Sequence, residues 1–159
     1  MTIDSTLEAA VREGFAASVA EEPDDFDAAI EAILDRGDDF TIGAFQLAIN
    51  VTAVILQDMH DGDVPEPKQI DDLADDFAQT QEDWSLVSAE LVRTYMSAAL
   101  GEQAVLDVMT PGDVAITGFA LGGWLLSAFL PDDKDWTDYL DEVLQVLETA
   151  LEEEDEPQD

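Results

Sequence analysis

The sequence predicts an all-α protein, a single-domain bundle of about six or seven helices. Apolar residues recur three or four positions apart through most of the chain, as they do along the buried face of a helix. No segment alternates apolar and polar residues for long enough to predict a strand. Proline, glycine and paired aspartates divide the chain into pieces of helical length. We therefore expect one helical domain over residues 1–151 and an acidic tail over residues 152–159.

The expected helices are separated by short connections that contain turn or capping residues. In the first helix every fourth residue is apolar, so these residues share one face. They are Leu7, Val11, Phe15 and Val19. Later helices begin near proline or paired aspartate and stop at glycine or proline, which are typical helix boundaries. We expect amphipathic helices over residues 5–20, 24–36, 67–79, 83–100 and 132–152, with one or two further turns within 102–109.

Two stretches carry no charged residue, residues 41–57 and residues 114–130. A helix that is apolar on all sides is buried, so we expect both at the centre of the bundle, packed against each other. A membrane span needs about 20 predominantly apolar residues. Each of these stretches has 17 residues, is interrupted by polar residues or glycines, and lacks flanking positive charges. We therefore expect two core helices and no interaction with a membrane.

The two uncharged stretches also have similar beginnings. Residues 37–45 resemble residues 112–119 if one gap is allowed, and two shorter amphipathic helices precede each segment. A duplicated three-helix unit explains this pattern. The alternative is that any two buried helices with acidic starts look alike. The internal repeat is a hypothesis that superposing residues 5–58 on residues 68–130 would test.

The chain is strongly acidic, with 39 aspartates and glutamates against five lysines and arginines, a net charge of −34. Such a surface repels phosphate backbones and anionic lipid headgroups. We therefore expect no direct binding to nucleic acid, and a basic protein is the natural partner. The chain has no cysteine and no signal-like N-terminus, which fits the cytoplasm.

One acidic segment is a candidate metal site, and it contains the single histidine. Its residues are Asp58, His60, Asp61 and Asp63. Carboxylates and an imidazole this close in sequence can bind a divalent cation weakly. The spacing does not match an EF-hand loop, and a tetrahedral zinc site would need further ligands. The favoured interpretation is a solvated loop after a helix, and we expect no cofactor.

A second candidate site lies in the predicted helix over residues 83–100. Glu90 is embedded in an apolar pattern and precedes Arg93 by three positions, with Tyr95 close by. These residues are candidates for a polar ligand-binding site inside a helical pocket. The favoured interpretation is a partly buried ion pair between Glu90 and Arg93 that holds the helix in place.

The sequence contains no phosphate-binding glycine loop, no nucleophile elbow and no zinc-binding helix motif. We therefore expect a non-enzymatic protein that acts through protein–protein interaction with its anionic surface. One alternative is a DNA-mimic inhibitor of a DNA-binding protein, since duplex DNA carries about one charge per 1.7 Å of axis and helical carboxylates can imitate it. Another is a small-ligand-binding or enzymatic bundle with a pocket near Glu90 and Arg93.

The acidity has a further explanation that involves no partner. Aspartate outnumbers glutamate by 24 to 15 and lysine occurs twice, a composition that also suits a protein from a high-salt cytoplasm. The sequence does not separate this habitat from a binding surface. It also leaves the oligomeric state open, including a homodimer.

Overall fold

The computed structural model describes residues 5–60, 62–85, 87–100, 105–128 and 135–155. Within these ranges every regular element is an α-helix and no strand is present, which confirms the predicted all-α fold. Seven of the helices have 12 residues or more, and α6 is a single turn. The helices are α1 (Ser5–Val19), α2 (Pro23–Leu34), α3 (Asp38–Met59), α4 (Pro67–Ser85), α5 (Ala89–Leu100), α6 (Val105–Val108), α7 (Pro111–Ala128) and α8 (Trp136–Asp155).

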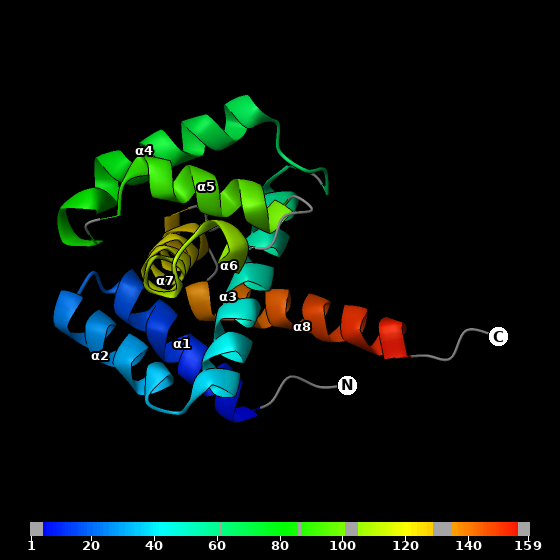
Figure 1. Ribbon diagram of the computed structural model, residues 1–159. Coiled ribbons are helices and arrows are strands. Elements are labelled where there is room, and N and C mark those ends of the chain that lie inside the picture. The colour runs from blue at the N-terminus through cyan, green and yellow to red at the C-terminus, as the bar shows by residue number, and fades with distance from the viewer. Residues whose placement is uncertain (1–4, 61, 86, 101–104, 129–134, 156–159) are drawn as a thin grey trace.

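Figure 1 shows α7 in the middle of the molecule, viewed close to its own axis, with the other helices arranged around it. The pair α1 and α2 lies on one side of α7, and the pair α4 and α5 lies on the other. α3 contacts both pairs and α7, while α8 packs on α3 and α7 and extends away from the bundle. The fold is therefore a helical bundle around one central helix.

The central helix α7 is one of the two predicted uncharged helices. From Val114 to Leu126 every side chain is buried except Ile116, which is 37% exposed. The helix begins as its sequence indicates, because the Thr110 hydroxyl accepts a hydrogen bond from the Asp113 amide at 3.2 Å. Residues 129–130, which were expected to complete it, lie outside the described residues.

The other uncharged helix, α3, packs against α7 as expected. Its burial is one-sided, because Phe45 and Val51 are buried whereas Ile42 is 53% exposed and Gln46 faces solvent. Within the described residues α3 is also the one helix long and apolar enough to cross a membrane, and half of that stretch is buried inside the protein. Core helices of globular proteins commonly share this composition, so the observation assigns no membrane role.

The ends of three helices differ from the sequence-based expectation. α4 continues to Ser85 and α5 begins only at Ala89, because the Ser88 hydroxyl accepts the amide of Leu91 at 3.3 Å and so caps a new helix. At the other end of the chain α8 begins at Trp136 and runs to Asp155. The first residues of the expected acidic tail are thus helical.

The order of the helices bears on the predicted internal repeat. Each half of the chain has two helices followed by an uncharged one, α1–α2–α3 and α4–α5–α7, with α6 inserted in the second half. The packing between the halves is not reciprocal, because α1 lies along α7 while α4 makes no comparable contact with α3 among the described residues. The repeat therefore remains a hypothesis.

Candidate functional site

The candidate site is built on α1, whose position is fixed by close packing on α7. A Cβ atom at Gly14 would lie 2.6 Å from the Phe119 ring, and one at Gly122 would lie 2.3 Å from the Phe15 ring. The two rings meet edge to face with their centroids 5.4 Å apart. The Ser18 hydroxyl adds a buried hydrogen bond of 3.1 Å to a backbone carbonyl of α7. α1 is thus a firmly held support for α2.

α2 lies against α1 and α3 and buries a narrow apolar stripe. The buried side chains of this stripe are Phe26, Ile30 and Ile33. Pro23 is the first helical residue and two aspartates follow it in the first turn, where carboxylates favour the positive end of the helix dipole. The remaining sides of α2 face solvent, so their residues determine the charge and polarity of this part of the molecular surface.

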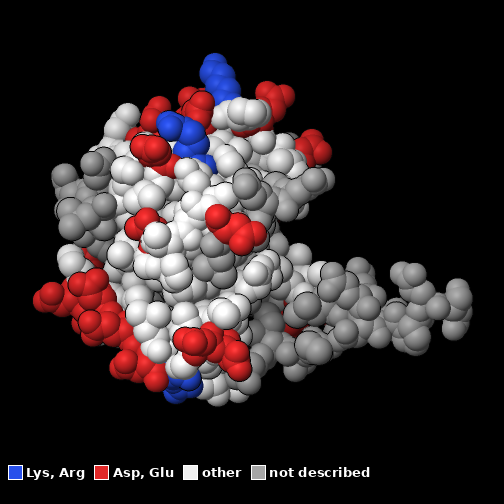
Figure 2. Space-filling model, viewed as in Figure 1, with Lys and Arg blue, Asp and Glu red and all other residues white. Residues whose placement is uncertain are grey.

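All nine acidic residues between positions 21 and 39 are exposed, and we call them the α2 acidic surface. Its members are Glu21, Glu22, Asp24, Asp25, Asp27, Glu31, Asp35, Asp38 and Asp39. Figure 2 shows acidic side chains gathered over α2, at the lower left of the view. The one base in this stretch, Arg36, lies over the Phe40 ring at 4.8 Å from its centroid. The surface is therefore almost uniformly negative.

Repulsion within this surface affects the ionisation of Glu22. A side-chain hydrogen bond with Asp25, together with the negative charge of Asp25, raises the pKa of the Glu22 carboxyl. The Glu22 carboxyl therefore holds its proton more readily beside Asp25 than it would alone, since a like charge nearby disfavours ionisation. The carboxylates at this end of α2 therefore repel one another.

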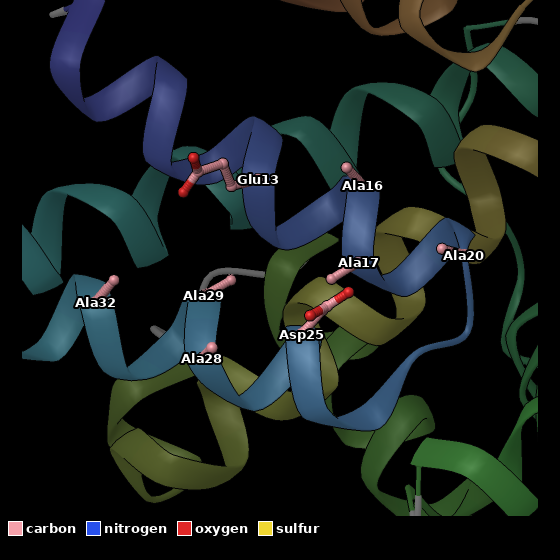
Figure 3. Close-up of a pocket in the computed structure, with 8 residues that line it drawn as sticks. All are labelled: Glu13, Ala16, Ala17, Ala20, Asp25, Ala28, Ala29 and Ala32. Carbon is pink, nitrogen blue, oxygen red and sulfur yellow. The ribbon is translucent and has the colours of Figure 1, made fainter.

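Between α1 and α2 runs an open groove of about 460 Å³, which we call the α1–α2 groove. Its lining consists of small apolar residues and two acids. The lining residues are Glu13, Ala16, Ala17, Ala20, Asp25, Ala28, Ala29 and Ala32. In Figure 3 Glu13 lies on the α1 wall and Asp25 on the α2 wall, toward opposite ends of the row of alanines. The groove therefore has an apolar floor and a carboxylate on each side.

The structure does not bring Glu90, Arg93 and Tyr95 together. Arg93 pairs across to α4, with its Nε 2.6 Å from Asp71 and a guanidinium nitrogen 3.9 Å from Asp75. Glu90 is exposed and is not the partner of Arg93 in either of these bonds, so the expected ion pair between them is corrected to one between α4 and α5.

A hollow of about 330 Å³ does reach Arg93, beside α5 and α6. Its other lining residues are Thr94, Ser97, Ala98 and Val108. Neither Glu90 nor Tyr95 is among them. The Arg93 guanidinium is held by two α4 carboxylates, which leaves it poorly placed to neutralise an anionic ligand. The geometry here supports a link between helices better than a ligand site.

Tyr95 is fully buried on the side of α5 that faces α7. Its hydroxyl has no hydrogen bond of good geometry to any described residue, although it lies near Thr52, whose own hydroxyl donates to the Ala48 carbonyl at 3.1 Å. Burial raises the pKa of Tyr95 well above its usual value, and the Thr52 hydroxyl counters only part of the rise. Tyr95 is thus a core residue.

Two residues of the candidate metal segment at the end of α3, Asp58 and His60, have hydrogen-bond partners within the protein. Asp58 accepts a hydrogen bond of 2.8 Å from the Tyr139 hydroxyl of α8. The His60 Nδ1 lies 2.6 Å from the Leu56 carbonyl oxygen, to which it donates. Asp63 is exposed, and Asp61 lies outside the described residues. In the part of the chain that the structure describes, no group of three histidines or acids could hold a metal ion.

Comparison with known proteins identifies no relative. No family model, no curated protein and no solved structure matches the chain.

The α1–α2 groove is the feature that sequence reasoning missed. Its signal is the placement of alanines four residues apart at solvent-facing positions of two successive segments. They include Ala16 on α1 with Ala20 directly after it, and Ala28 and Ala32 on α2. Elsewhere the exposed positions of this chain are rich in acids. A run of small exposed residues in such a sequence marks a surface without charge.

Proposed function

We propose that this protein is a non-enzymatic interaction protein and that the α2 acidic surface binds a basic partner protein. The observation that supports the proposal is the exposure of all nine acids between residues 21 and 39, with a single base among them. A surface of one sign attracts proteins of the opposite sign and accelerates their association.

Helix stability accounts for only part of this surface. Asp24 and Asp25 lie in the first turn of α2, where negative charge is favourable by about 0.3–1 kcal/mol per residue. Asp27 lies between the two ends of α2, where the helix dipole contributes little, whereas Glu31 and Asp35 lie at its C-terminal end, where the dipole disfavours negative charge. The last turn of α2 contains no base to balance them. Glu31 and Asp35 therefore weaken the isolated fold, and binding a cationic partner would offset that effect.

The described arginines do not neutralise the α2 acidic surface. Arg12 is engaged by Glu8 of its own helix at 3.2 Å and by Asp141 of α8. Arg93 is engaged by α4, on the far side of α7. Arg36 lies over an aromatic ring at one end of the surface. The negative potential over α2 is thus directed to solvent and available to a partner.

Affinity capture from native lysate of the source cells tests the proposal. The bait is the whole protein, used at low and at high salt because screening shortens to about 3 Å at 1 M. A neutralised bait carries Asp27→Asn, Glu31→Gln and Asp35→Asn. A control bait carries Glu66→Gln, Asp72→Asn and Asp76→Asn, three exposed acids on and beside α4. Both variants change the net charge by the same amount.

We expect the wild-type and control baits to retain a basic protein at low salt, and the neutralised bait to lose most of it. Release of that protein by duplex DNA would identify the partner as a DNA-binding protein and the interaction as DNA mimicry. Retention that is equal for both variants would assign the interaction to overall charge and not to α2. If no basic protein is retained by any bait, the proposal is wrong.

A further inference from the structure

We infer that the α1–α2 groove is the docking site for an amphipathic helix of the partner, one with apolar residues on one face and Lys or Arg along its flanks. The inference rests on the proposed function and adds to it the form of the partner's binding segment and the place where it lies. Helix-in-groove docking of this kind uses apolar anchors on one helical face.

The floor of the groove is suited to another helix. It contains six alanines, of which two belong to α1, one directly follows α1, and three belong to α2. A methyl group projects little from the helix surface, so the axis of an incoming helix can approach to the 8–10 Å, roughly, that is typical of packed helices.

The exposed surface of α2 is divided between two kinds of residue. Asp27, Glu31 and Asp35 are exposed and do not line the groove, whereas Ala28 and Ala32 are exposed and do. One strip of the same helix is thus charged and the neighbouring strip is apolar. A binding segment that matches both strips must have an apolar face bordered by positive charge.

Charge decides between the occupants that could cover an apolar groove. A second copy of this chain also carries a net charge of −34 and would bring its own acids against Glu13 and Asp25. An anionic membrane surface is repelled in the same way. An added β-strand would need an exposed sheet edge, and the described residues contain no strand. A cationic helix meets the apolar floor and the acidic walls together.

The two wall carboxylates also constrain the partner's sequence. Glu13 and Asp25 stand on opposite walls and toward opposite ends of the groove (Figure 3). A docked helix therefore needs a basic residue on each flank, one near each end of its apolar stripe. The negative charge of Asp25 contributes to the raised pKa of Glu22, so a cation placed at the α2 wall would relieve repulsion there.

A pair of synthetic peptides tests the inference. Both have about 18 residues of leucine, alanine and lysine in the same amounts, a length at which isolated helices can form. In one the apolar residues share a helical face with lysines on both flanks, and in the other the order is scrambled. Binding to the full chain is measured by fluorescence anisotropy at physiological salt. We expect the amphipathic peptide to bind at least about tenfold more tightly, because it alone buries an apolar face.

Two neutral variants locate the binding. Ala28→Gln with Ala32→Gln places polar side chains in the groove and leaves the charge unchanged. Ala9→Gln with Ala150→Gln makes the same change at exposed positions outside the groove. We expect the groove variant to lose about tenfold in affinity for the amphipathic peptide and the control to keep it. Circular dichroism of both variants shows that each remains folded.

Shifts of alanine methyl resonances provide a second readout that does not depend on substitution. We expect the peptide to shift the methyls of Ala16, Ala20, Ala28 and Ala32. Equal binding of the two peptides, or unshifted groove methyls, would overturn the groove inference. It would leave the proposed function standing if the α2 neutralised bait still loses its basic partner. If instead the neutralised and control baits retained the basic partner equally, the proposed function itself would be overturned.

Discussion

The edge of the Phe15 ring lies against the backbone of Gly122, where α1 crosses α7. A Cβ atom at residue 122 would stand 2.3 Å from Cε1 of that ring, closer than carbon atoms approach in proteins. Phe15 is completely buried and its ring packs edge to face on Phe119, so it has little room to move away. The absence of a side chain at residue 122 therefore sets the distance between α1 and α7.

We expect Gly122→Ala to destabilise the protein by about 1–3 kcal/mol, because the added methyl overpacks the α1–α7 contact. Urea unfolding followed by far-UV circular dichroism measures the change. Gly112→Ala is the matched control, because a Cβ at residue 112 of the same helix meets nothing within 4 Å. That substitution should be neutral or stabilise by about 0.4–1 kcal/mol. A Gly122→Ala protein as stable as wild type would contradict the close packing.

The order and type of the helices could be predicted because local patterns carry them. Continuous apolarity predicted a buried α7, and a four-residue period predicted α1. The end of α4 and the start of α5 could not be predicted. They depend on a single capping hydroxyl, that of Ser88, in a region whose other residues favour a continuous helix. The partner of Arg93 was assigned to the nearest acid in sequence, whereas the fold supplies Asp71 from 22 positions away.

The groove was harder to predict than the helices. Alanine is a good helix former in any environment, so its occurrence in α1 and α2 did not distinguish an exposed floor from an ordinary helix. The composition showed that the protein is acidic. To recognise that exposed acids are concentrated on α2, one must know the exposure of each carboxylate, which only the structure gives. Periodicity predicts single helices, so it does not predict a feature such as this groove, which forms between two helices.

Tyr95 offers a second test, because its buried hydroxyl has no well-formed hydrogen bond to a described residue. An unsatisfied buried polar group lowers stability by about 1–3 kcal/mol. We therefore expect Tyr95→Phe to be neutral or to stabilise by up to about 1 kcal/mol in urea unfolding. Tyr139→Phe should instead lower stability by about 0.5–1.5 kcal/mol, because the Tyr139 hydroxyl donates to Asp58 at 2.8 Å. A marked loss of stability in Tyr95→Phe would show that its hydroxyl is satisfied.

The same hydroxyl is expected to couple to Gly118. A Cβ at residue 118 would lie 2.8 Å from the Tyr95 hydroxyl oxygen and 3.2 Å from the ring carbon that bears it. Gly118→Ala should destabilise by about 1–3 kcal/mol in the wild-type protein and by clearly less in the Tyr95→Phe protein. A double-mutant cycle should thus give a coupling of about 0.5 kcal/mol or more between these contacting residues. If the effects of the two substitutions were additive, the Tyr95 hydroxyl would not be in contact with residue 118.

Arg12 joins α1 to α8 through Asp141 and also pairs with Glu8. Partial burial alone would lower the pKa of Arg12, but the hydrogen bonds and charges of Asp141 and Glu8 together raise it, so the side chain stays charged. The pair is largely exposed, and exposed pairs contribute about 0–1 kcal/mol. A cycle of Arg12→Met and Asp141→Asn should therefore show a coupling of that size that disappears at high salt. A coupling independent of salt would indicate a desolvated pair.

Salt and mild acid should both stabilise this protein, since each reduces repulsion among its acids. At Glu22 the sign follows from the raised pKa in the folded state. The contribution of Glu22 is fully present below the pKa of the unfolded chain and is lost as the pH rises through the folded pKa. Thermal unfolding across this acidic range should give a higher midpoint at lower pH and a smaller pH dependence in Glu22→Gln. Glu31→Gln removes the same charge from α2 without removing the bond to Asp25, so it should keep more of the wild-type pH dependence. Identical pH profiles for the two variants would assign the effect to net charge and not to the contact between Glu22 and Asp25.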